Sequence, residues 1–92
     1  MDKLERAVVN AEEARQLLAN PMLEKAFDDK RRGILEAWAA LSTSDTEHSK
    51  DLHRRLKMLD SVKRCLQEHV TTGKLAHHEL EQRSKLLNFR RA

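Results

Sequence analysis

Residues 42–46 read STSDT, and this short polar loop decides the fold because the apolar residues before and after it pair around it. The pairs have residue numbers that sum to about 93, and the ones nearest the loop are Leu41 with Leu52, Trp38 with Leu56 and Ile34 with Leu59. Apolar residues at equal distances from a short connection meet when two helices fold back on each other. The sequence therefore predicts an all-α fold, a long kinked antiparallel helical hairpin.

The same register predicts the residues at which the two arms pack together. These helix–helix interface residues are Leu23, Phe27, Ile34, Trp38, Leu41, Leu52, Leu56, Leu59, Val62, Leu66 and Val70. Farther from the loop, the register pairs Ala7 with Leu86 and Leu4 with Phe89. Lys30-Arg31 interrupts the apolar pattern, and we expect the long stems of these side chains to extend past Val62.

Local signals divide the arms into helices at about residues 3–19, 21–41, 46–72 and 74–88. Asn20-Pro21 breaks the first arm, since Asn is a good N-cap and proline suits the first helical position. Ser44 with Glu47 fits a capping box for the next helix. Gly73 interrupts the second arm, and either ends one helix or only kinks a continuous one.

Length and composition indicate one helical domain over residues 1–92. Charged residues make up 36% of the chain and aromatic residues 3%, with two glycines, one proline and no tyrosine, which argues against an all-β fold. The net charge of +3 is uneven: residues 1–45 carry seven basic and nine acidic side chains, giving −2, and residues 46–92 carry eleven and six, giving +5. The charge alone is weak support for a nucleic-acid partner.

No motif in the chain indicates catalysis, a metal or a cofactor. His77 and His78 lie four and three residues before Glu81, but a zinc site needs three or four converging ligands. Cys65 lies four residues before His69, yet no oxyanion-hole loop or third orienting group accompanies the pair. We therefore expect a protein that is not an enzyme and has no cofactor.

A basic face on the third predicted helix is the remaining polar signal. Lys50, Arg54, Lys57 and Arg64 share one side of this helix at helical spacing. Such a face could contact nucleic acid or an acidic partner. Acidic residues interleave with it and no aromatic side chain offers a stacking platform, so nucleic acid is the less favoured partner.

Self-association is expected because two helices cannot enclose a core. Apolar residues beside the interface, among them Val9, Met22, Leu35 and Met58, widen the stripe toward the face typical of bundle helices. Two hairpins could cover these stripes as a four-helix bundle. The alternative is a compact monomer in which residues 3–19 fold back at Asn20-Pro21 to make a three-helix bundle.

A family resemblance supplies a biological setting. The order Leu17-Leu18-x-Asn20-Pro21, Phe27, Trp38, a polar loop, Leu56-Lys57-x-Leu59-Asp60-x-Val62 and Thr72-Gly73-Lys74 resembles small helical proteins of tailed-bacteriophage and prophage genomes. Their genes often lie near head and packaging genes, and most have no assigned activity. The resemblance implies a scaffold, adaptor or minor virion component, with itself or other phage structural proteins as partners, in the host cytoplasm or the virion. One cysteine cannot form an internal disulfide, and no apolar run is long enough to cross a bilayer, so we expect a soluble protein in a reducing compartment that does not enter a membrane.

Overall fold

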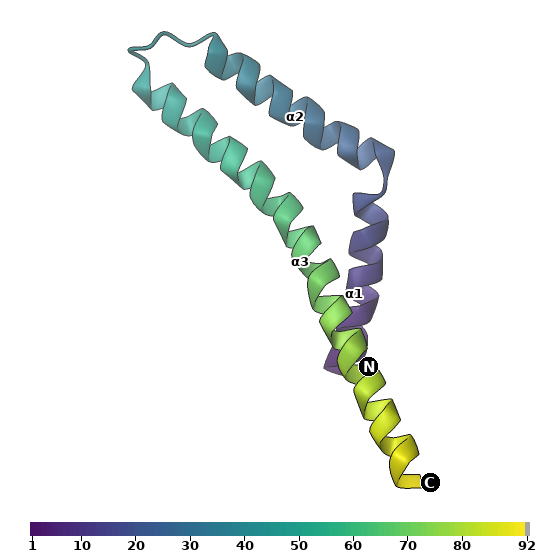
Figure 1. Ribbon diagram of the computed structural model, residues 1–92. Coiled ribbons are helices and arrows are strands. Elements are labelled where there is room, and N and C mark those ends of the chain that lie inside the picture. Colours follow the sequence, from purple (N-terminus) through teal and green to yellow (C-terminus); the bar gives the residue numbers. More distant parts are fainter. Residues whose placement is uncertain (92) are drawn as a thin grey trace. The chain divides into compact units, whose positions relative to one another are not determined.

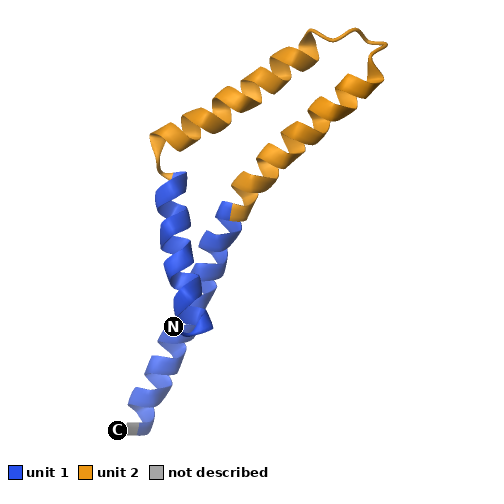
Figure 2. Ribbon diagram, turned by 180° about the vertical axis from the view of Figure 1, so that it is seen from behind, with its two compact units in different colours: residues 1–18, 66–92 blue, residues 19–65 orange. Residues whose placement is uncertain are grey.

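The computed structural model describes residues 1–91, and in this range it contains three α-helices and no strand (Figure 1). The helices are α1 (Lys3–Leu18), α2 (Pro21–Ala39) and α3 (Thr46–Arg91). The predicted all-α fold is confirmed. Contacts divide the chain into two units: α1 with the described part of α3 from Leu66 onward forms unit 1, and residues 19–65 form unit 2 (Figure 2).

The joint between α1 and α2 forms where the sequence predicts it. The Asn20 side chain accepts hydrogen bonds from the backbone N–H groups of Met22 and Leu23, at 2.8 and 3.3 Å. Asn20 itself has extended backbone geometry, and Pro21 occupies the first helical position, where no N–H is needed. Two of the otherwise unpaired donors at the start of α2 are thereby satisfied.

The loop between α2 and α3 is capped by Asp45 rather than by Ser44. The Asp45 carboxylate accepts a hydrogen bond from the His48 backbone N–H at 3.2 Å, and α3 begins at Thr46. The Ser44 hydroxyl lies 2.9 Å from that of Ser42, inside the loop. The capping box predicted from Ser44 and Glu47 is therefore wrong by one residue, because the carboxylate is the stronger acceptor and lies one position closer to the helix.

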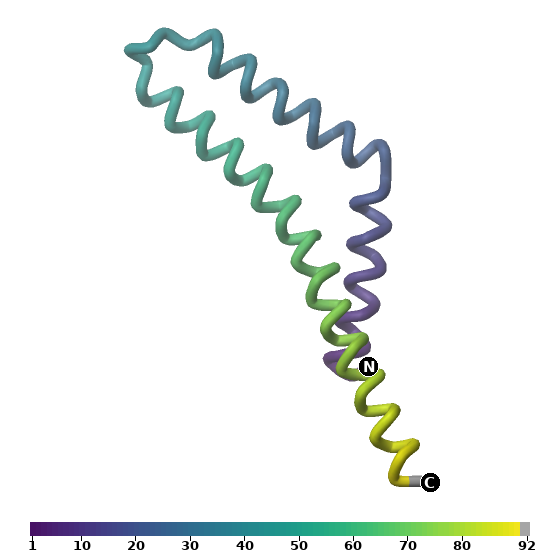
Figure 3. Tube along the Cα trace, viewed as in Figure 1, coloured from purple at the N-terminus to yellow at the C-terminus, as the bar shows by residue number. Residues whose placement is uncertain are grey.

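The third helix continues through the predicted interruption at residues 71–73 (Figure 3). Gly73 does not have the positive φ of a helix-ending glycine. The Thr71 hydroxyl donates to the Gln67 carbonyl at 3.2 Å, which satisfies this side chain within the helix. Two helices at 46–72 and 74–88 are thus replaced by one, and Gly73 lies inside it.

Unit 2 is a two-helix hairpin close to the predicted register. The Arg31 guanidinium on α2 pairs with the Asp60 carboxylate on α3 at 2.6 Å, and the rings of Trp38 and His53 are 5.8 Å apart. Both pairs have residue numbers that sum to 91, against the expected 93. Descending numbers on α2 meet ascending ones on α3, so the two helices are antiparallel.

Unit 1 is also an antiparallel pair, but its register differs from the expected one. Ala11 on α1 packs against Gly73, and Asp2 lies 3.7 Å from Arg83, so the paired numbers sum to 84 and 85. The expected pairings of Ala7 with Leu86 and of Leu4 with Phe89 are wrong, because Ala7 lies beside Gly73 and Asp2 beside Arg83, and Leu86 and Phe89 are 52% and 80% exposed. The prediction assumed that one register continues through Asn20-Pro21, whereas small residues that allow close approach set the pairing of α1.

Candidate interaction surfaces

Ten of the eleven expected interface residues are half-buried. In unit 2 these include Ile34, Trp38 and Leu56, and in unit 1 they are Leu66 and Val70. Val62 differs, because its side chain is 56% exposed. None of the eleven is fully buried, which is expected when each is covered by only one neighbouring helix.

Small residues form the closest packing in unit 1. Ala14 and Ala76, each 4% exposed, are the buried hydrophobic residues within the described chain. Gly73 lies directly against Ala11, so a methyl group at residue 73 would overlap the Ala11 methyl and lie 3.0 Å from the Ala7 carbonyl oxygen. Close approach of the two helices therefore replaces the large apolar core that a globular domain would have.

One side of the unit 2 hairpin is closed by polar and aromatic contacts. Ile34 faces α3 from α2, and at about 100° per residue Arg31 lies to one side of it around the helix. His53 and Asp60 lie on the same side of the hairpin, on α3. The Arg31–Asp60 ion pair and the edge-on contact between Trp38 and His53 span the two helices there. The sequence predicts that the Arg31 stem extends past Val62, but it gives no sign of the ion pair with Asp60, which depends on the register of the two helices.

The opposite side of unit 2 is open, and most of the residues that line it are small or apolar. A groove of about 550 Å³ lies between the helices, lined by Ala26, Asp29, Lys30, Gly33, Ile34, Ala37, Leu52 and Arg55. Nothing lies within 4 Å of the position that a Gly33 side chain would take. Helical spacing continues this side along α2 to Met22 and along α3 to Met58 and Val62, which are 68%, 69% and 56% exposed. We call this surface the open face: Met22, Ala26, Gly33, Ala37, Leu52, Met58 and Val62.

The basic face points away from α2. Lys50, Arg54, Lys57 and Arg64 are all exposed, and they lie on the side of α3 opposite Leu52. The Lys50 ammonium lies 3.9 Å from the Glu47 carboxylate. The charged groups of Arg54, Lys57 and Arg64 have no carboxylate oxygen of residues 1–91 within 4.0 Å. Three cations are thus available to an acidic partner. Ser61 occupies the gap between Lys57 and Arg64, so the face is discontinuous.

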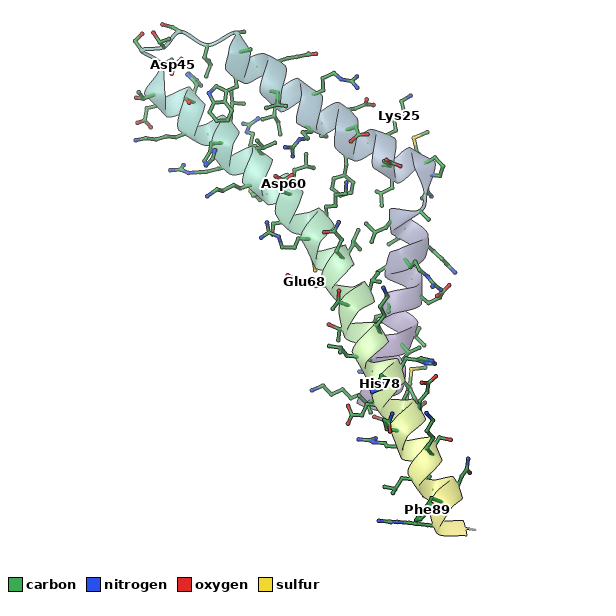
Figure 4. All side chains as sticks on the ribbon, viewed as in Figure 1. Lys25, Asp45, Asp60, Glu68, His78 and Phe89 are labelled. Atoms are coloured by element: carbon green, nitrogen blue, oxygen red, sulfur yellow. The ribbon has the colours of Figure 1, made fainter. Side chains whose placement is uncertain are left out.

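The histidines and the cysteine do not converge. Within residues 1–91 no three His, Cys, Asp or Glu side chains lie together as metal ligands would. His77 pairs with Glu81 at 3.0 Å, and His48 pairs with Asp45 at 2.7 Å. The Asp45 carboxyl, which is labelled in Figure 4, has its pKa lowered below its ordinary value by the hydrogen bond from His48. Cys65 is exposed and unbridged.

Helix composition and comparisons with known proteins add two findings. None of the helices in residues 1–91 has the length and apolarity needed to cross a membrane. No protein-family model, curated protein or solved structure matches the chain. The resemblance to bacteriophage proteins therefore stays a prediction from the sequence.

Proposed function

We propose that this chain is a non-enzymatic assembly protein that acts by packing its helices against those of another chain, with self-association as its working state. The observation that carries the proposal is the distribution of its apolar side chains. Among the described residues only Ala14 and Ala76 are buried hydrophobic residues, while eleven large hydrophobic side chains are exposed. A folded chain with this distribution leaves many large apolar side chains available to a partner.

The energetics support a partner-dependent state. Full burial of one Leu, Met, Val or Phe side chain contributes roughly 1.5–3 kcal/mol relative to exposure. Unit 1 leaves Leu75, Leu86 and Phe89 at 69%, 52% and 80% exposure, and unit 2 leaves Met58 at 69%. Most of this contribution is missing in the isolated chain and becomes available on association.

The proposed setting is a phage particle, in which the protein is a scaffold, an adaptor or a minor virion component. The support is the order of residues from Leu17 to Lys74 that resembles small phage proteins. Helix-in-groove packing would supply affinity, and charges beside the apolar surface would select the partner.

The second candidate is a small phage regulator that binds nucleic acid or a host protein through the basic face. The observation in its favour is that Arg54, Lys57 and Arg64 have no nearby carboxylate in the described chain. Phosphate contacts by three cations would make binding fall steeply with salt. A nucleic-acid titration at two salt concentrations separates the candidates, because helix packing through apolar surface requires no nucleic acid.

Light scattering of the purified chain, over a wide range of concentration, tests the favoured function. The proposal expects a mass at a multiple of 10.7 kDa. A mass of 10.7 kDa at every concentration, together with one cooperative thermal transition, would contradict it. Salt-dependent binding of DNA or RNA by that monomer would favour the regulator instead.

A further inference from the structure

The open face of unit 2 lacks a covering element within its own hairpin. The contacts that tie α2 to α3 lie on the other side, at Arg31–Asp60 and Trp38–His53. On the open face, small residues line the groove, and Met58 and Val62 stand beside it at 69% and 56% exposure. A helix that enters such a groove can approach to the 8–10 Å typical of packed helices and bury both side chains.

We infer that the open face binds the open face of a second copy of this chain, so that two α2–α3 hairpins stack into a four-helix bundle. This inference rests on the proposed function and specifies its partner and surface. A two-fold arrangement places the same face of each chain against the other, as in most homodimers. Met58 and Val62 of each chain then cover the groove of the other chain.

The charges of the open face favour a second copy over a nucleic acid. The groove carries Asp29 and Lys30 from α2 and Arg55 from α3, and Arg55 pairs with Asp51 at 3.1 Å. Together with Asp51, the charged side chains beside the open face are two acidic and two basic, so they carry no net charge, although residues 46–92 as a whole carry +5. A face with both signs can oppose itself across a two-fold axis without juxtaposing like charges, whereas a phosphate backbone would meet two carboxylates.

The exposed side chains of the open face also fit a second copy. Met22, Met58 and Val62 are 68%, 69% and 56% exposed, and they come from both helices of the hairpin. A second hairpin spans both helices and can cover all three side chains, whereas a small ligand in the groove would leave them exposed.

Two substitutions on the open face test the inference, each with a control on the same helix. Gly33→Gln fills the groove from α2, and the new Cβ has open space because nothing lies within 4 Å of it. Its control is Leu35→Lys, since Leu35 is 44% exposed on the other side of α2. Val62→Lys places a charge on the α3 side of the open face, and its control is Ser61→Lys on the exposed outer side of α3.

Sedimentation equilibrium of the full chain measures the outcome, with circular dichroism to verify that every variant keeps its helices. We expect the wild type and both controls to have twice the mass of 10.7 kDa, and both open-face variants to dissociate at least about tenfold more readily. A helical open-face variant as dimeric as the wild type overturns the inference and leaves self-association through another surface. A wild type that stays at 10.7 kDa overturns both the inference and the proposed function.

Discussion

Substituting alanine at the two glycines should change stability in opposite directions, although both glycines lie inside helices. At Gly33 nothing lies within 4 Å of the new methyl group. Alanine is favoured over glycine in a helix interior by about 0.8–1.0 kcal/mol, so Gly33→Ala should stabilise the unassociated chain by about that amount. The same helix-propensity gain applies at Gly73, which makes Gly33→Ala a matched control.

At Gly73 the new methyl group meets α1. It would overlap the Ala11 methyl by more than about 1 Å relative to the normal carbon–carbon contact of 3.5–4.0 Å, and it would lie 3.0 Å from the Ala7 carbonyl oxygen. Neither atom can rotate away, so the two helices must separate. Overpacking costs about 1–3 kcal/mol, and an overlap with rigid atoms belongs at the upper end of that range. After subtracting the gain in helix propensity, Gly73→Ala should destabilise the protein by about 2 kcal/mol.

Urea unfolding followed by circular dichroism, at one fixed protein concentration low enough to keep the chain unassociated, measures both variants. The two free energies of unfolding should differ by about 3 kcal/mol, with wild type between them. Ala11→Gly in the Gly73→Ala background removes the methyl–methyl overlap and should recover part of the loss, which a double-mutant cycle would report as coupling. If Gly73→Ala stabilised the protein as much as Gly33→Ala does, α1 and α3 would not approach at this point and the register of unit 1 would be wrong.

Three further predictions concern a cap, a titration and a charged face. Asn20→Ala removes the acceptor for two N–H groups of α2 and should cost about 1 kcal/mol in urea unfolding, whereas Asn20→Asp, another good cap, should cost little. Because the bond with His48 lowers the pKa of Asp45, this carboxylate stabilises the fold above its ordinary pKa; the contribution is lost as the pH falls through the lowered value, and Asp45→Asn should flatten that part of an acid titration monitored by helicity. Neutralising Arg54 and Lys57 together should leave the association mass unchanged, and a drop in mass would assign assembly to the basic face.

Local signals allowed the sequence to predict the helices. Asn20-Pro21 defines a joint through one side-chain acceptor and one ring, and both act within three residues. The polar loop from Ser42 to Asp45 likewise connects α2 and α3 by only a few residues. The pairing of the two helices near the loop is therefore fixed to within a residue or two. The pairings in unit 2 therefore fall within two residues of the expected sum.

Packing between distant segments was not predictable in the same way. The sequence predicts an interruption at Gly73, either a helix end or a kink, because glycine is a poor helix former and a frequent helix terminator. In the structure Ala11 packs directly against Gly73, where a side chain would leave no room for it. Glycine is needed at this position for close approach of the two helices and not for its backbone freedom. No local pattern identifies Ala11 as its neighbour, and the register of unit 1 was therefore missed.

The basic face could be predicted from the sequence, whereas the open face could not. The positions of Lys50, Arg54, Lys57 and Arg64 on one side of a helix follow from spacing alone, and the structure places them on the outer side of α3. The open face depends on which side of the hairpin carries the Arg31–Asp60 contact. Sequence periodicity gives the width of an apolar stripe but does not say which half of it the partner helix leaves uncovered.

The most direct measurement of the central claim is the thermal midpoint as a function of protein concentration. If folding is completed by a second copy, association stabilises the native state by mass action, and a hundredfold rise in concentration adds about 2.7 kcal/mol per dimer, which is about 1.4 kcal/mol per chain. For a chain of this size the midpoint should then rise by roughly 5–10 °C between about 2 and 200 μM. A midpoint that stays constant over this range would show that the single chain reaches its full stability alone, which contradicts the account.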